Sequence, residues 1–360
     1  MSVPLRVAAW LAVGTVSIGC SSSRSGSPAG GAPDSSAPPS CTSSTCAGTC
    51  TAGQCVVTLS TVNDSAYAYD IVLGKTTVYW AEQHVNGSGA ILSVPAAGGA
   101  TVTLASATEA PYGLAVDTSH AFWSGSAGGG LYDAGFIASV PVSGGSLATI
   151  ASGLSPPSAM ATDGTNVYFT TSSPCGSINC TGYVLSVPVG GGTVSTLASH
   201  PGAGAWIIST HGQLYWTTVD GRVLTVPASG GTPTQLAYEV TAGLAVVADQ
   251  AAAYWANSAG EVKRLPLDGG QATVLALGQS PIAALAVDDT SVYWINSPFN
   301  IPSVPGATAS VMKVPIDGGP VTAIQAPDGG WFQGLAVDDT SLYLLVGFEG
   351  RAAVLKVTPK

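Results

Sequence analysis

Residues suited to catalysis or metal binding are few in this chain. Its histidines, His84, His120, His200 and His211, show no H-E-x-x-H or comparable ligand spacing. Residues 310–313 match the S-x-x-K pattern, but they lie in register with residues 90–93 of an apparent strand and have no companion motif. No G-x-S-x-G, P-loop or G-x-G-x-x-G sequence is present. The sequence therefore favours a protein that is not an enzyme, and we expect neither a cofactor nor a metal site.

Charge is scarce and mostly negative. Charged residues make up 8% of the chain, and ten Lys and Arg stand against twenty Asp and Glu, giving a formal net charge of -10. Binding to the nucleic acid backbone needs clustered Lys and Arg. The composition therefore excludes a nucleic acid partner.

Six cysteines are candidates for disulfides, because an even number in an exported chain usually forms a covalent framework. The first four follow C-x4-C-x3-C-x4-C within residues 41–55, a segment too small to bury a core without cross-links. A four-cysteine zinc site is the alternative, although the C-x2-C pairs of zinc ribbons are missing. Pairing among these four is open. The candidates are Cys41, Cys46, Cys50, Cys55, Cys175 and Cys180.

The N-terminus has the pattern of a secretory signal peptide over residues 1–20. Arg6 precedes an apolar stretch that is too short to span a bilayer, and Ile18, Gly19 and Cys20 resemble the end of a bacterial lipobox. We predict that Cys20 is lipidated, with release into the medium as the alternative. Residues 21–40 are rich in Ser, Gly, Pro and Ala, which predicts a flexible tether.

One block recurs from residue 60 to the C-terminus. A short apolar strand usually ends in Asp, a turn and an aromatic pair follow, and a further strand ends in Pro before Gly-Gly and a last strand. Gly-Gly supplies the positive φ of a tight hairpin. The block predicts four strands per repeat, which is a β-propeller blade. The pairs, roughly 40 to 50 residues apart, are Tyr79-Trp80, Phe122-Trp123, Tyr168-Phe169, Tyr215-Trp216, Tyr254-Trp255, Tyr293-Trp294 and the weaker Tyr343-Leu344.

Closure of the ring follows from the two ends of the repeat region. The seventh copy stops after its third strand, near Val357, whereas residues 56–60 match the fourth strand of the first copy. Pairing these residues with the strand near Val354 would complete the blade and leave no open sheet edge. We predict an all-β propeller of seven four-stranded blades over residues 56–360, with six blades as the alternative.

The repeat resembles the YWTD repeat of lipoprotein-receptor propellers, most visibly in LYWTTVDGRVL at residues 214–224. It is more loosely similar to other exported bacterial propellers. The resemblance covers about 300 residues, and it implies a rigid ring that displays loops. It implies no partner, because the Asp after Tyr-Trp-Thr is absent here and the receptors carry six blades.

Departures from the repeat mark a candidate ligand face. Insertions lie between second and third strands at residues 82–89, 124–135, 170–181 and 295–310. These loops share one face of a propeller with the segments that lead into each first strand, and loops on a rigid scaffold commonly carry function. Aromatic residues beside acids suit a sugar, a peptide or a cationic ligand. The candidates are Glu82, His84, Glu109, Tyr112, His200, Trp206, Glu239, Trp331, Phe332 and Gln333. For Trp206, Trp331 and Phe332 the sequence slightly favours the alternative that they plug the narrow end of the ring.

These features lead to two main hypotheses, with a purely structural envelope component that binds no ligand as a third. The first is a monomeric lipoprotein of the bacterial envelope, in the outer membrane, that binds a protein, peptide or glycan and touches the membrane only through its lipid. The second is a propeller enzyme, a metal-assisted lyase or hydrolase, in which His84, His200 and nearby Glu82, Glu109 or Glu239 converge at the axis. Convergence of two histidines and a carboxylate within ligand reach would favour the enzyme.

Overall fold

The computed structural model describes residues 41, 46–51, 53–63, 67–84, 87–126, 134–172, 180–239, 243–279, 282–296, 309–324, 331–348 and 351–360. Regular structure in this part of the chain is entirely β. No helix among these residues has the length and apolar character needed to cross a membrane.

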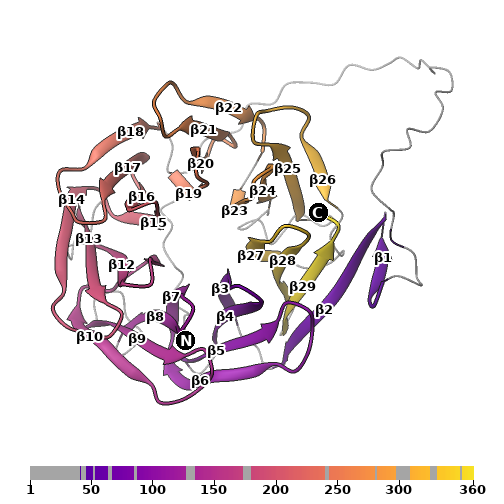
Figure 1. The fold of residues 1–360 in the computed structure, drawn as a ribbon, viewed down its shortest axis with the longest axis horizontal. Coiled ribbons are helices and arrows are strands. Elements are labelled where there is room, and N and C mark those ends of the chain that lie inside the picture. Colours follow the sequence, from indigo (N-terminus) through magenta and orange to yellow (C-terminus); the bar gives the residue numbers. More distant parts are fainter. Residues whose placement is uncertain are drawn as a thin grey trace, which may run out of the picture.

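Seven antiparallel sheets stand around a central axis and form a closed ring (Figure 1). The first strand of each sheet is innermost, and these inner strands contact one another in sequence around the ring. The first three blades are β3 (Tyr67–Leu73), β4 (Thr77–Gln83), β5 (Ser88–Pro95) and β6 (Val102–Glu109); β7 (Pro111–Val116), β8 (His120–Ser126), β9 (Gly135–Pro141) and β10 (Ala148–Leu154); and β11 (Met160–Thr162), β12 (Asn166–Ser172), β13 (Thr181–Pro188) and β14 (Ser195–Pro201).

The remaining blades repeat the same order. Seven sheets exclude the six-bladed alternative and confirm the predicted fold. The strands are β15 (Gly204–Thr210), β16 (Gln213–Thr218), β17 (Arg222–Pro227) and β18 (Thr234–Tyr238); β19 (Gly243–Ala248), β20 (Ala252–Asn257), β21 (Val262–Pro266) and β22 (Thr273–Ala276); β23 (Ile282–Val287), β24 (Ser291–Asn296), β25 (Ser310–Pro315) and β26 (Thr322–Ile324); and β27 (Trp331–Val337), β28 (Leu342–Phe348) and β29 (Arg351–Thr358), which pair with β2 (Gln54–Asn63).

Each recurring Asp caps the turn between the first and second strands, as its position predicted. In the third blade, Oδ1 of Asp163 accepts hydrogen bonds from the backbone N–H groups of Thr165 and Asn166, both at 2.8 Å. Its Oδ2 accepts from the Tyr168 hydroxyl at 2.7 Å, and burial together with this Asp raises the pKa of Tyr168 to about 12. The same contacts recur at Asp249, Asp288 and Asp338.

The aromatic pairs form the core, which lies between blades. Because side chains alternate along a strand, the two members of a pair face opposite neighbours. Tyr254 packs against the sixth blade in a cluster with Trp294, whereas Trp255 packs against the fourth blade beside Tyr215. Trp80 is fully buried and belongs to the same core cluster as Tyr343 of the seventh blade. Each blade therefore anchors both of its neighbours through adjacent residues.

The seam joins the two ends of the chain. β2 pairs with β29 in antiparallel register, with Val56 opposite Val357 and Ser60 opposite Val354. This confirms the predicted closure, but β2 is longer than expected and starts at Gln54, within the cysteine-rich segment. A short β1 (Thr49–Thr51) pairs with the start of β2 and extends the seam sheet to five strands. The cysteine-rich segment is thus an edge extension of the last blade.

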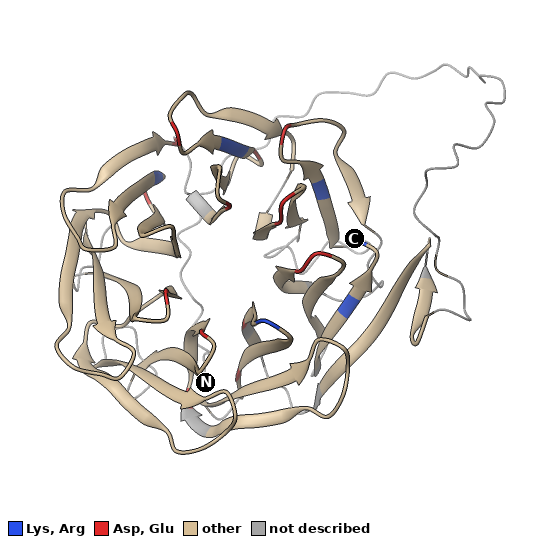
Figure 2. Ribbon diagram, viewed as in Figure 1, with Lys and Arg blue, Asp and Glu red and all other residues tan. Residues whose placement is uncertain are grey.

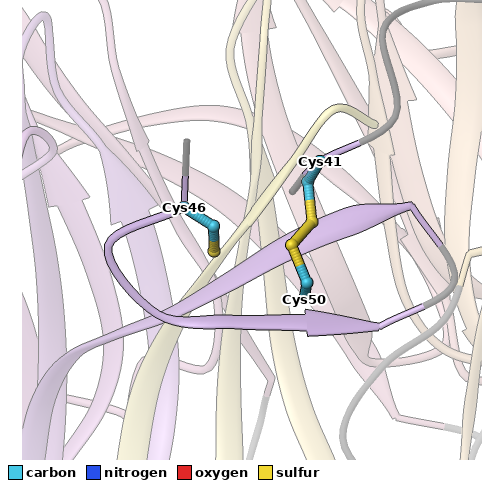
Figure 3. A group of neighbouring side chains, drawn as sticks. All are labelled: Cys41, Cys46 and Cys50. Atoms are coloured by element: carbon cyan, nitrogen blue, oxygen red, sulfur yellow. A yellow bond between two sulfur atoms is a disulfide. The ribbon is translucent and has the colours of Figure 1, made fainter. Parts of the chain in front are cut away.

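Two disulfides hold this extension, and Figure 3 shows the one between Cys41 and Cys50 together with the side chain of Cys46. Cys41 bonds to Cys50 and Cys46 to Cys55, with Cα–Cα distances of 6.1 and 5.4 Å. The first and third cysteines therefore pair, as do the second and fourth, which decides among the three pairings that spacing left open. Such short loops constrain a segment that has few apolar residues to bury.

The C-terminal residue fastens the sixth and seventh blades beside the seam. The Lys360 ammonium contacts the Asp288 carboxylate and the Asp338 backbone carbonyl, while the Lys313 ammonium donates to the Lys360 carbonyl oxygen at 3.0 Å. Burial alone would raise the pKa of Asp288, but Lys360 and hydrogen bonds from Thr290 and Ser291 lower it to about 2. Lys360 therefore links the sixth and seventh blades beside the seam.

Candidate functional site

The ring has two faces of different character. Antiparallel strands place second-to-third loops and the segments between blades on one face, which we call the loop face. The Asp turns and Gly-Gly turns lie on the opposite face, which we call the turn face. The acidic residues in Figure 2 gather mainly in short turns, and the basic ones lie mainly on third strands such as β21, β25 and β29. The predicted ligand residues belong to the loop face, although much of the insertions lies outside the described residues.

In the first blade the predicted residues are tied to the fold. Glu82, at the end of β4, is 2% exposed and accepts a hydrogen bond from the Trp80 indole nitrogen. Burial raises the pKa of Glu82, while Trp80 and His84 act against that shift. The His84 backbone N–H donates to the Ser88 carbonyl at 2.7 Å and closes the next turn. These residues therefore stabilise the loop face of the blade.

The aromatic candidates divide between the core and the surface. Phe332 is 1% exposed and packs among core residues of the sixth and seventh blades, so it is not available to a ligand. Trp206, near the start of β15, is 39% exposed, and Tyr112 contacts the Ser126 hydroxyl at 3.2 Å. Glu109 is exposed and Gln333 half-buried, whereas the Trp331 side chain lies outside the described residues.

A residue in the segment before a blade's first strand can accept a hydrogen bond from the tryptophan on that blade's second strand. We call this place the lead-in position. In the fifth blade it holds Glu239, whose carboxylate accepts from the Trp255 indole at 3.0 Å and the Asn257 amide at 3.1 Å. The Lys263 ammonium lies 2.7 Å from the same carboxylate and 2.9 Å from Glu261. Glu239 is 7% exposed, so this buried charge is paired and hydrogen-bonded within the protein.

The sixth blade has a neutral version of the same contact. Oε1 of Gln279 accepts from the Trp294 indole nitrogen at 3.3 Å and from the Asn296 amide at 2.8 Å. The lead-in position therefore offers an acceptor to the indole in both blades. Sequence reasoning singled out Glu239 as a ligand residue, but its contacts show that it fills an internal need.

The lead-in position of the fourth blade holds His200, which lies near the end of β14 in the third blade, and there the contact is incomplete. The His200 ring lies against Trp216, with ring centroids 5.3 Å apart. His200 Nδ1 lies 3.2 Å from the Pro201 carbonyl oxygen, so this nitrogen carries the hydrogen. Within the described part of the chain, neither His200 Nε2 nor Trp216 Nε1 has a hydrogen-bond partner, although both are buried. Burial, together with the nearby Arg222, lowers the pKa of His200, so the ring is neutral at neutral pH.

His200 borders a cavity of about 440 Å³ between the third and fourth blades on the loop face. An ion pair between Asp220, in the turn after β16, and Arg222, the first residue of β17, forms part of the wall. The Arg222 guanidinium also lies over the ring of Tyr238, 5.4 Å from its centroid. The lining residues are Cys180, Thr181, Ser199, His200, Pro201, Gly202, Asp220 and Arg222.

Two glycines make room for the polar groups of this cavity. A Cβ on Gly182 would lie 2.2 Å from Cε1 of His200, and one on Gly202 would lie 2.5 Å from Oδ1 of Asp220. Gly202 also has a φ of 81°, which a side chain would strain. The Gly202 backbone N–H donates to the Cys180 carbonyl at 2.7 Å, and Cys180 is in a disulfide. Cys175, its predicted partner, lies outside the described residues.

The metal centre of the enzyme hypothesis is not assembled in the described part of the chain. His84 belongs to the first blade and His200 to the third, on separate parts of the ring. Among the described residues, the one group of three His, Cys, Asp or Glu ligand atoms within 4.8 Å of one another is Cys41, Cys46 and Cys50. These sulfurs belong to the two disulfides, which accounts for their proximity.

The arrangement of blades is shared with solved propellers. The crystal structure of the computationally designed Ika8 protein aligns with a TM-score of 0.57 and 14% identity, over 84% of this chain and 99% of that one. The chain is a β-propeller. The WD40 propeller domain of Doa1 aligns with a TM-score of 0.59 and 9% identity, over 83% and 96% of the two chains. No protein-family model and no curated protein matches the sequence. At these identities the likeness shows the fold alone.

Sequence reasoning missed Asp220, Arg222 and the two glycines as site residues. Asp220 and Arg222 stand inside the stretch that resembles a YWTD repeat, so they were counted as part of the fold. One signal was present: Asp-Gly-Arg in the turn after β16 is a concentration of charge in a chain with few charges.

Proposed function

We propose that this chain is a non-enzymatic envelope lipoprotein whose propeller binds a ligand through the loop face. The observation that supports this best is the cavity beside His200, which an ion pair lines and next to which two buried nitrogens have no hydrogen-bond partner among the described residues. The groups around Glu239 are already paired with one another, so they do not offer free hydrogen-bonding atoms to a ligand. A rigid ring that displays loops suits a binding or scaffold role.

Export and lipid attachment are supported by the first twenty residues and by the disulfides, which persist in oxidising compartments. The anchor at Cys20 and the tether at residues 21–40 would hold the ring away from the outer membrane. The variant Cys20→Ala should move the protein from the membrane fraction to the soluble fraction. Retention of this variant in membranes would contradict lipid attachment.

Binding through the loop face can be tested by replacing residues 173–180 with two glycines. The change removes Cys175 and Cys180 together and leaves β12 and β13 intact, because they end at Ser172 and begin at Thr181. We expect immobilised wild-type ring to retain envelope components that this variant loses. Asp268→Asn, in a turn-face cavity of about 380 Å³, is the matched control and should retain them. Equal recovery by all three proteins would contradict the proposed face.

A further inference from the structure

We propose that the turn-face cavity of the fifth blade binds a free α-amino acid with an apolar side chain, with Arg264 facing its carboxylate and Asp268 its ammonium group. This site lies on the face opposite the loop face and does not rest on the proposed function. Three observations support it: a cation without a counterion, a second charge of opposite sign in the same cavity, and apolar residues beside both.

The cavity has a volume of about 380 Å³ and is lined by residues of two turns in the fifth blade. The turn between β19 and β20 contributes Gln250 and Ala251, and the turn between β21 and β22 contributes Leu267, Asp268 and Gly269. The Leu267 backbone N–H donates to the Ala251 carbonyl at 2.8 Å and ties the two turns together. Cavities of this size commonly hold small molecules.

Arg264 is one of three basic residues that occupy the same position in consecutive blades (Figure 1). Each stands on a third strand opposite the tyrosine of its blade, and the other two are Lys313 and Lys356. The Lys313 ammonium donates to the Lys360 carbonyl and the Lys356 ammonium to the Ala96 carbonyl, each at 3.0 Å and each in the next blade. In the described part of the chain Arg264 donates to no carbonyl oxygen, and it lines the cavity instead.

The positive charge of Arg264 has no counterion among the described residues, where every ion pair involves another cation. Burial and Asp249 raise the pKa of Tyr254 to about 12, and Arg264 acts against that rise, but Arg264 and Asp249 form no ion pair. Arg264 is half-buried, and a guanidinium removed from bulk water interacts most strongly with a carboxylate, whose two oxygens match its geometry. The cavity is therefore suited to a carboxylate.

Asp268 supplies the opposite charge. It is exposed, it lies four residues after Arg264, and across the described ranges the two side chains form no ion pair although they line one cavity. In the loop-face cavity, by contrast, Asp220 and Arg222 pair with each other. A ligand with a carboxylate alone would be repelled by Asp268. Two opposite charges that stay apart match a ligand that carries both, as a free amino acid does at neutral pH.

Apolar residues of the same cavity favour an apolar side chain on the ligand. Pro266 and Leu267 are half-buried, and Ala251 is exposed beside them. Contact with an aliphatic side chain would remove apolar surface of both molecules from water. A ligand side chain with a second carboxylate would meet the charge of Asp268. We therefore expect alanine, valine or leucine to bind in preference to aspartate or glutamate.

The test is calorimetric titration of the mature protein with alanine, valine and leucine, and with two derivatives of leucine. N-acetylleucine keeps the carboxylate without an ammonium group, as the C-terminus of a peptide does, and leucinamide keeps the ammonium group without a carboxylate. We expect at least one free amino acid to bind with a Kd below about 1 mM. Each derivative should bind about tenfold more weakly than leucine, because it leaves one charge of the cavity unpaired.

Two variants examine the residues. Arg264→Gln removes the charge that faces the carboxylate, and Asp268→Asn removes the charge that faces the ammonium group. Each should weaken the binding of leucine about tenfold. The matched controls, Lys313→Gln and Asp317→Asn, change the same positions of the sixth blade and should leave binding unchanged. Because Asp268 is exposed, its variant remains informative should Arg264→Gln not fold.

The inference is overturned if no free amino acid binds with a Kd below about 1 mM, or if both fifth-blade variants bind as tightly as the controls. Equal binding of leucine and N-acetylleucine would assign the cavity to a carboxylate alone and reject the amino acid, and equal binding of leucinamide would also reject it. The loop variant that lacks residues 173–180 should bind amino acids as the wild type does. Failure of this site and failure of the loop face are therefore measured separately.

Discussion

The lead-in positions of the fourth and fifth blades occupy matching places and differ in what they leave unpaired. In the fifth blade, Glu239 binds Trp255, Asn257 and Lys263, and the protein satisfies its own polar groups. In the fourth, His200 contacts Trp216 through its ring but leaves a nitrogen on each side chain without a partner in the described residues. A repeated fold can therefore pair the polar groups of one position in one blade and leave those of the matching position unpaired in another.

The largest effect on stability is expected at the lead-in position of the fifth blade, which holds Glu239. Glu239→Leu would leave the Trp255 indole nitrogen without its acceptor, leave Glu261 as the one carboxylate that accepts from the Asn257 amide, and remove one of the two carboxylates beside Lys263. We expect a loss of about 3 kcal/mol in the free energy of unfolding, measured by urea denaturation. The control Glu261→Gln changes a carboxylate whose side chain is 28% exposed, and should cost less than about 1 kcal/mol. Equal losses would show that Glu239 is not the centre of the network.

A comparison of two tryptophan variants measures the hydrogen bond between Trp255 and Glu239. Trp255→Phe and Trp216→Phe remove the same atoms from fully buried positions, so their packing losses should be similar. Only Trp255 donates to a buried carboxylate. We therefore expect Trp255→Phe to cost about 1 kcal/mol more in the free energy of unfolding. A greater loss from Trp216→Phe would mean that its indole nitrogen has a strong partner.

The pH dependence of stability should reveal the lowered pKa of His200, at the lead-in position of the fourth blade. Burial, with a contribution from Arg222, lowers the pKa of His200 below its usual value of 6.5. As the pH falls through 6.5, the unfolded chain takes up a proton that the folded chain binds only at lower pH, so stability decreases. Urea midpoints measured between pH 7 and pH 5 should show this decrease, and His200→Phe should reduce it. An unchanged slope in the variant would contradict a lowered pKa.

The smallest effect is expected at the wall of the cavity. The ion pair of Asp220 and Arg222 is partly exposed, and exposed pairs contribute little to stability. Asp220→Asn should change the free energy of unfolding by less than about 1 kcal/mol in thermal or urea unfolding. A loss as large as that of Glu239→Leu would assign this pair a structural role instead.

Much of the fold could be predicted because its signals are local. Asp163 and Tyr168 are five residues apart, and their contacts depend on one turn, so the spacing alone predicted the capped hairpin. The seam was predictable because Val56–Ser60 match a fourth strand that the last repeat lacks. The start of β2 at Gln54 was not, since the segment's cysteines hide its strand pattern.

The candidate site was predicted only in part. His200 was identified from its chemical type and its place before a first strand. Its ion-pair neighbours were not, because Asp220 and Arg222 lie in another blade and meet the cavity only when the ring closes. Phe332 and Glu239 were candidates by residue type, but the core and Lys263 respectively engage them.

The sequence by itself determined the repeat, the ring and the face on which its insertions lie, since strand alternation, Gly-Gly turns and capping Asp residues act over a few positions. The tertiary structure decided which polar groups are satisfied. The acceptor for a buried indole comes from the segment between blades. The acceptor's other partners, such as Asn257 and Lys263, come from the second and third strands of the next blade. Whether Glu239 closes a network or His200 opens on a cavity therefore depends on packing between blades.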